Sequence, residues 1–78
     1  MMVGWLIYGK RTGLPDKHGQ PVFDKTFRAL NSKGQRVTSL NEAMCYATKE
    51  DAQLILDYPG TQKFIDQKLV VFEIRRAK

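Results

Sequence analysis

The sequence predicts an α+β fold of two layers, in which a small antiparallel or mixed β-sheet of about four strands carries one main helix on one face. Two observations predict it: β-favouring apolar runs stand near both ends of the chain, and a capped amphipathic segment precedes the second of them. The expected order of elements is β-β-β-α-β. With 78 residues and no repeat or linker, the chain is expected to form a single compact domain over residues 1–78.

The first strand is predicted from Val3 to Lys10. Residues 5–8 read Trp-Leu-Ile-Tyr, a β-favouring run with a glycine on either side. The next stretch, residues 11–21, contains two glycines, two prolines and an aspartate. This density of turn-forming residues predicts an exposed loop.

A second strand is predicted over Val22–Leu30, where Phe23 and Phe27 share one face of a period-two pattern and Asp24 lies on the other. Residues 31–34 read Asn-Ser-Lys-Gly, which predicts a tight turn whose glycine adopts a positive φ. The short segment 36–38 is a candidate to pair back onto the second strand.

The segment from Ser39 to Tyr58 contains two candidate helix starts, because Ser39 and Thr48 each stand three residues before an acid. If Thr48 is the cap, a third strand covers Ala43–Ala47 and the main helix runs from Lys49 to Tyr58. If Ser39 is the cap, one longer helix covers the whole segment. We prefer Thr48, because the polar run that begins there would interrupt the apolar face of a longer helix.

Pro59 ends the main helix on either interpretation, and a short helical turn is predicted over Thr61–Gln67. The last strand, Leu69–Arg76, is apolar on both sides and is therefore predicted to be central in the sheet. The expected core joins helix residues Ala52, Ile55 and Leu56 to Trp5 or Ile7, Phe27, and Val71 or Phe72.

The net positive charge is confined to the first half of the chain. Residues 1–40 carry seven cations and two acids, whereas residues 41–78 carry six of each sign, so the net charge of +5 lies entirely in the first half. Clustered Lys and Arg attract phosphates or carboxylates over about 10 Å in physiological salt. The sequence therefore points to an acidic partner, although the same charge would also serve simply to keep a small protein in solution.

No motif in the sequence predicts an enzyme. Gly4, Gly9 and Lys10 match the front of a phosphate-binding loop, but Arg11 stands where that motif needs Ser or Thr. With one histidine and one cysteine, the chain lacks the ligands of a zinc site. We therefore expect no catalytic residue, no metal and no cofactor.

The predicted location is the cytoplasm. The lone Cys45 allows no internal disulfide, which is typical of proteins in a reducing compartment. The apolar run from Val3 to Tyr8 is too short for a signal peptide or a membrane span, so no membrane partner is expected.

The favoured function is a small non-catalytic protein-interaction or regulatory module that docks onto an acidic protein surface or forms a homodimer through an exposed strand edge. The alternative is a nucleic-acid-binding accessory protein that contacts phosphates. The expected cations fall at the two ends of the second strand and at the end of the last strand. The predicted binding residues in both cases are Lys10, Arg11, Lys17, Arg28, Lys33, Arg36, Arg75 and Arg76.

Overall fold

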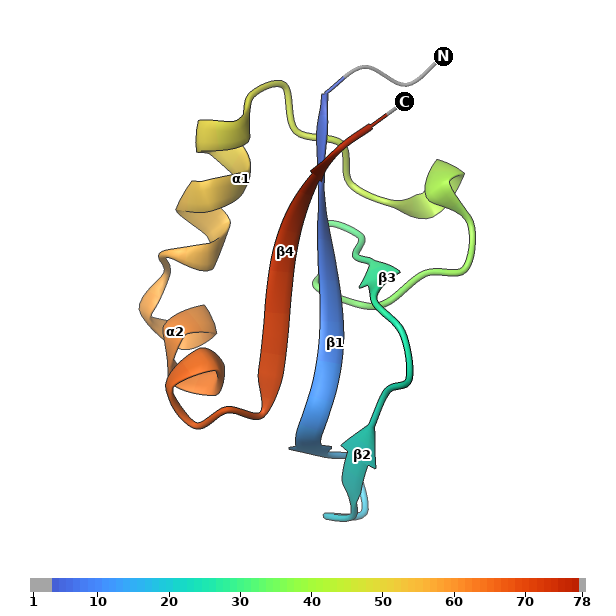
Figure 1. The fold of residues 1–78 in the computed structure, drawn as a ribbon, viewed down its shortest axis with the longest axis vertical. Helices are drawn as coiled ribbons and strands as arrows, with labels where there is room; N and C mark the ends of the chain where they lie inside the picture. The colour runs from blue at the N-terminus through green and yellow to red at the C-terminus, as the bar shows by residue number, and fades with distance from the viewer. Residues whose placement is uncertain (1–3, 78) are drawn as a thin grey trace.

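A long first strand, β1 (Trp5–Pro15), runs through the middle of an antiparallel four-stranded sheet in the computed structural model, which describes residues 4–77 (Figure 1). Two helices lie on one side of this sheet, so the predicted small α+β fold is confirmed. The remaining elements are β2 (Pro21–Phe23), β3 (Arg28–Ala29), a 3₁₀ turn (Leu40–Glu42), α1 (Lys49–Leu56), α2 (Pro59–Asp66) and β4 (Val70–Arg76).

The last strand, β4, lies at an edge of the sheet. It pairs with β1 from Trp5 opposite Arg76 to Arg11 opposite Val70, whereas β2 and β3 pair with the other side of β1. The prediction that the last strand is central was wrong. An apolar run on both sides of a strand reports how its two faces are covered, and it says nothing about how many strands are its neighbours.

β1 is longer than the sequence predicted, because the expected loop over residues 11–21 is strand as far as Pro15. Gly13 has a φ of +131°, and the pairing register shifts between Thr12 and Leu14. Such a bulge lets the strand bend without ending. The turn itself is confined to residues 16–20, and Val3, where the strand was predicted to begin, lies outside the described residues.

The predicted second strand, residues 22–30, is divided into β2 and β3 by Asp24. The N–H of Arg11 donates to the Asp24 carboxylate at 2.7 Å, and the N–H of Asp24 donates to the Arg11 carbonyl at 2.8 Å. A side chain thus accepts the hydrogen bond that a backbone carbonyl accepts in a regular ladder. The strand is interrupted at this point for that reason.

The tight turn over residues 31–34 is confirmed. The Asn31 carbonyl accepts the N–H of Gly34 at 3.0 Å, and Gly34 has a φ of +80°. Beyond the turn, Arg36 forms a bridge with Leu30, so the chain does pair back on itself here. This turn fixes the position of the segment that carries Lys33 and Arg36.

Both candidate helix starts act as caps. The Thr48 hydroxyl accepts the N–H of Asp51 at 3.1 Å and begins α1, which confirms the preferred start. Ser39 accepts the N–H of Asn41 at 3.3 Å and begins only the short 3₁₀ turn. The predicted third strand, residues 43–47, was wrong, because it is reduced to a bridge between Trp5 and Tyr46.

Pro59 begins a second helix as well as following the first. It occupies the first turn of α2, where its missing N–H costs nothing. Two helices of eight residues each therefore occupy the place predicted for one main helix and a short turn. Within residues 4–77, no helix is long and apolar enough to cross a membrane.

The core lies between β1, β4 and α1. Its buried centre is Ile7, Ala52 and Leu56, which confirms the predicted contact of the helix with β1. Phe27 is not part of it, because its ring lies against Lys10 and Arg75 instead. The residues packed around the buried centre are Trp5, Leu30, Tyr46, Ile55, Phe72 and Ile74.

Two leucines of α1 provide a matched test of this core. Leu56 is 9% exposed and Leu54 is 60% exposed, although both lie in the same helix. We expect Leu56→Ala to lower the free energy of unfolding by about 2–4 kcal/mol, because it leaves a cavity, and Leu54→Ala to change it by less than about 0.5 kcal/mol. Urea unfolding followed by circular dichroism measures both, and equal losses would contradict the assigned core.

Candidate binding groove

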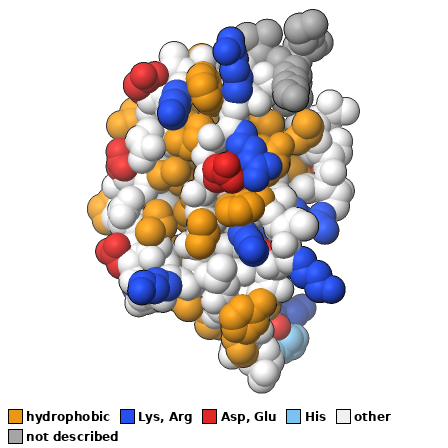
Figure 2. Space-filling view, in the orientation of Figure 1, with side chains coloured by type: hydrophobic (Ala, Val, Ile, Leu, Met, Phe, Trp, Pro, Cys, Tyr) orange, Lys and Arg blue, Asp and Glu red, His pale blue; other side chains and the backbone are white. Residues whose placement is uncertain are grey.

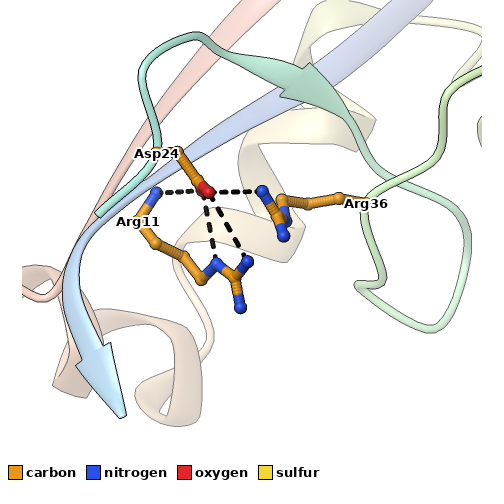
Figure 3. A network of polar contacts seen from close by, with 3 residues as sticks. All are labelled: Arg11, Asp24 and Arg36. Atoms are coloured by element: carbon orange, nitrogen blue, oxygen red, sulfur yellow. Dashed lines mark hydrogen bonds and ion pairs between the residues drawn. The ribbon is translucent and has the colours of Figure 1, made fainter. Parts of the chain in front are cut away.

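Asp24 holds two arginines from different parts of the chain together (Figure 3). Arg11 comes from β1 and Arg36 from the segment after β3. The Asp24 carboxylate accepts from Arg11 Nε at 3.3 Å and from Arg36 Nη1 at 2.5 Å. The Asp24 side chain is 10% exposed and is largely shielded from water, whereas the side chains of Arg11 and Arg36 are 26% and 28% exposed.

The cluster joins two basic segments that the sequence placed at opposite ends of the second strand. Sequence reasoning assigned Asp24 to the solvent side of that strand and missed its role. A signal was present, since Asp24 is the only acid between residues 17 and 41, a stretch that otherwise carries five cations. A lone acid in such a stretch has several cations competing for it, so a paired position is favoured.

A groove of about 760 Å³ opens beside this cluster. Its floor is apolar and is formed by residues of the sheet and of α1, among them Ile7, Leu30 and Phe72. The cations Arg11 and Arg36 lie on its rim. Among the described residues, the cations that line the groove are Lys10, Arg11, Lys33 and Arg36. The ammonium of Lys10 lies over the Phe27 ring, 5.9 Å from its centre, so the groove receives the charges of the other three.

The opposite wall of the groove is the start of α2. Tyr58, the N-cap residue, makes no side-chain capping bond, and Gly60 and Thr61 also line the groove. The first amides of a helix carry partial positive charge. Among the described residues that line the groove there is no aspartate or glutamate, so both walls favour a negative ligand.

Tyr46 supplies a neutral polar group to the groove. Burial raises the pKa of its hydroxyl above the ordinary value for tyrosine, because the charged phenolate would lose hydration. The hydroxyl therefore remains protonated at neutral pH and can donate a hydrogen bond.

The other predicted cations lie apart from the groove. Lys17 is in the exposed turn after β1, Arg28 is exposed on β3 opposite Gly9, and Arg76 pairs with Trp5 at the far end of the sheet. In the view of Figure 2, Lys and Arg side chains are spread along the molecule with apolar side chains between them. The eight predicted residues thus do not share one stripe, and the structure brings the charges of Arg11, Lys33 and Arg36 together at the groove. Lys10 also lines the groove, but its ammonium lies over the Phe27 ring.

Arg75 has a different environment. Its guanidinium lies 4.5 Å from the centre of the Tyr8 ring and 5.3 Å from that of Phe27, and it donates to Glu73 at 2.9 Å. The bond to Glu73 raises the pKa of the guanidinium further above its ordinary value. Arg75 is therefore already engaged within the protein.

The described residues offer no cluster of three or more His, Cys, Asp or Glu side chains that would hold a metal ion. Comparison with known proteins gives no further guide to chemistry: no family model matches the chain, and no curated protein and no solved structure shows significant similarity to it. The groove and its cations are thus the feature from which a function is argued.

Two aspartates provide a test of the cluster with matched charge. We expect Asp24→Asn to lower the free energy of unfolding by about 1–3 kcal/mol, because it removes the charge that Arg11 and Arg36 share in a partly buried place. Asp66→Asn removes the same charge from the exposed end of α2 and should change it by less than about 0.5 kcal/mol. Thermal unfolding of both variants at one salt concentration measures the difference. Equal effects would mean that the cluster does not stabilise the fold.

Proposed function

We propose that this protein is a small non-catalytic interaction module whose groove binds an acidic segment of a partner protein. The observation that carries the proposal is the lining of the groove: among the described residues, the cations Arg11, Lys33 and Arg36 and no acid border an apolar floor. A positive rim steers a negative partner into place and rejects a positive one. An apolar floor then favours a partner that also carries large apolar side chains.

The size of the groove supports a peptide ligand. Its volume of about 760 Å³ falls within the range of protein sites that bury a compact ligand. Each large apolar side chain that becomes fully buried there would contribute about 1.5–3 kcal/mol before the loss of conformational freedom is counted. A segment with one or two such side chains between acids matches both the floor and the rim.

The cluster around Asp24 supports the same proposal. Arg11 and Arg36 are held in place before any ligand arrives, so little side-chain entropy is lost when they bind a carboxylate. Asp24 neutralises only one of the two positive charges. Lys33, whose side chain is exposed in the turn over residues 31–34, adds an adaptable third cation.

Nucleic-acid binding is the second candidate, and one observation favours it. Tyr8 and Phe27 lie close together with Arg75 and Lys10 over their rings, a combination of aromatic and basic side chains that stacks single-stranded bases in other proteins. In this arrangement, however, cations already lie over the ring faces, and Glu73 lies next to Arg75. A base would have to displace Arg75 and approach a carboxylate, so we place this function second.

The test uses two lysines that differ in position and not in charge. Lys33 lines the groove and Lys17 lies in the turn after β1. Binding of labelled acidic peptides with Leu and Phe at varied spacing is measured by fluorescence anisotropy. We expect Lys33→Glu to weaken binding by about threefold to tenfold and Lys17→Glu by less than about twofold, because a single rim charge contributes about 1 kcal/mol.

Two further ligands complete this experiment. Peptides in which Ser replaces Leu and Phe should bind at least about tenfold more weakly, because the apolar floor then gains nothing. A single-stranded oligonucleotide provides the comparison with the second candidate. Equal losses of peptide affinity in the two lysine variants would mean that binding depends only on the net charge of the protein. Tighter binding of the oligonucleotide than of the peptides, with a steep dependence on salt, would favour nucleic acid as the ligand.

A further inference from the structure

Within residues 4–77, the outer edge of β4 is a row of backbone groups without hydrogen-bond partners. At the two ends of its pairing with β1, the Leu69 carbonyl accepts from Thr12 N–H and Ala77 N–H donates to the Gly4 carbonyl, both at 2.8 Å. Antiparallel pairs alternate, so every second residue of β4 points its N–H and C=O away from β1. In the described part of the chain, no hydrogen bond reaches these outward groups, which belong to Val70, Phe72, Ile74 and Arg76.

The other edges of the sheet are covered or short. The Ile7 and Arg11 carbonyls on the far side of β1 accept from the N–H groups of Leu30 and Asp24. Beyond β3, the Ala29 carbonyl accepts from Val37 N–H, and β2 has only three residues. The seven residues of β4 are thus the one long edge that is open among the described strands, and such an edge is a template for another strand.

The helices do not seal this edge. A hollow of about 380 Å³ lies between β4 and the helices, and it is lined by Val70 and Phe72 on one side and by Gln53 and Gln62 on the other. In Figure 1, α2 stands beside the start of β4 and α1 beside its C-terminal half, and the last part of β4 bends away from α1 toward the chain end. Val70 at the start of β4 is buried, whereas Arg75 and Arg76 at its end are exposed. Residues 72–76 are therefore the part of the edge most open to a second strand.

We propose that a second copy of this chain pairs its own β4 antiparallel with this edge, about a two-fold axis through Ile74. In this arrangement Ile74 faces Ile74 of the second copy, and Phe72 faces Arg76 of the second copy. Both are hydrogen-bonded pairs, in which the two opposite residues exchange N–H to C=O bonds. This is possible because the N–H and C=O groups of Phe72, Ile74 and Arg76 point away from β1. The two sheets become one, and the groove at Arg11 and Lys33 is not involved.

Charge complementarity favours this register over its neighbours. Glu73 and Arg75 already form an ion pair within each chain, at 2.9 Å. With the axis at Ile74, Glu73 stands opposite Arg75 of the second copy and Arg75 opposite its Glu73, so the two ion pairs join into a cluster of four alternating charges on the exposed face. With the axis one residue earlier, Glu73 would face Glu73 and repel it. With the axis at Phe72, Glu73 would face Val71 and gain nothing. Because β4 carries these two charges at alternate positions, its own sequence is the matching partner.

The test is a charge exchange at residues 73 and 75, read by sedimentation velocity over a wide range of protein concentration. We expect the wild-type chain to dimerise, and Glu73→Arg and Arg75→Glu each to weaken the dimer by about tenfold, because each places like charges opposite each other twice. An equimolar mixture of the two single variants should form a heterodimer, since the charges of one then complement those of the other. Circular dichroism checks that each variant is folded.

A backbone variant tests the edge itself. Arg76→Pro removes an N–H that β4 does not use within one chain, so the fold should persist while the dimer weakens. A wild-type chain that stays monomeric at every concentration would overturn the proposal. So would a dimer that the charge exchanges and Arg76→Pro leave unchanged, which would place the interface elsewhere. The proposal would also be overturned if the chain stayed monomeric and its β4 edge bound an extended peptide from another protein.

Discussion

The pairing of β1 on both of its sides is the constraint on which the rest of this structure depends. One side of β1 bonds to β4, and the other side bonds to the segment from Pro21 to Tyr46. A chain of this length has little apolar material to bury, so one shared strand must organise both halves. The bonds from Leu30 to Ile7 and between Tyr46 and Trp5 tie the irregular first half to the regular sheet.

The groove follows from the difference in length between the two layers. β1 has 11 residues and spans about 36 Å, whereas α1 and α2 have eight residues each and span about 12 Å each. Two short helices cannot cover the whole face of the sheet, and the part near Leu30 and Phe72 remains partly open. An apolar floor is thus left exposed, and the turn over residues 31–34 places cations at its border.

The distribution of charge gives that groove its preference. The first half of the chain carries the excess of positive charge, yet only the cations that Asp24 and the turn bring together meet at one place. Asp24 lies with its carboxylate largely covered by the two arginines, so it holds them without presenting a negative surface to a ligand. Other cations lie apart from the groove: Lys17 is in the turn after β1, and Arg76 lies opposite Trp5 at the far end of the sheet.

The sequence by itself determined the features that depend on neighbouring residues. Thr48 begins the helix, the turn over residues 31–34 forms as predicted, and the small α+β composition is correct, because caps and turns are satisfied within a few residues. Only the tertiary structure decided which strand is central, where the second strand is interrupted and which cations meet. Those choices depend on contacts between residues 12 or more apart, such as Asp24 with Arg36 and Arg11, and local patterns carry no record of them.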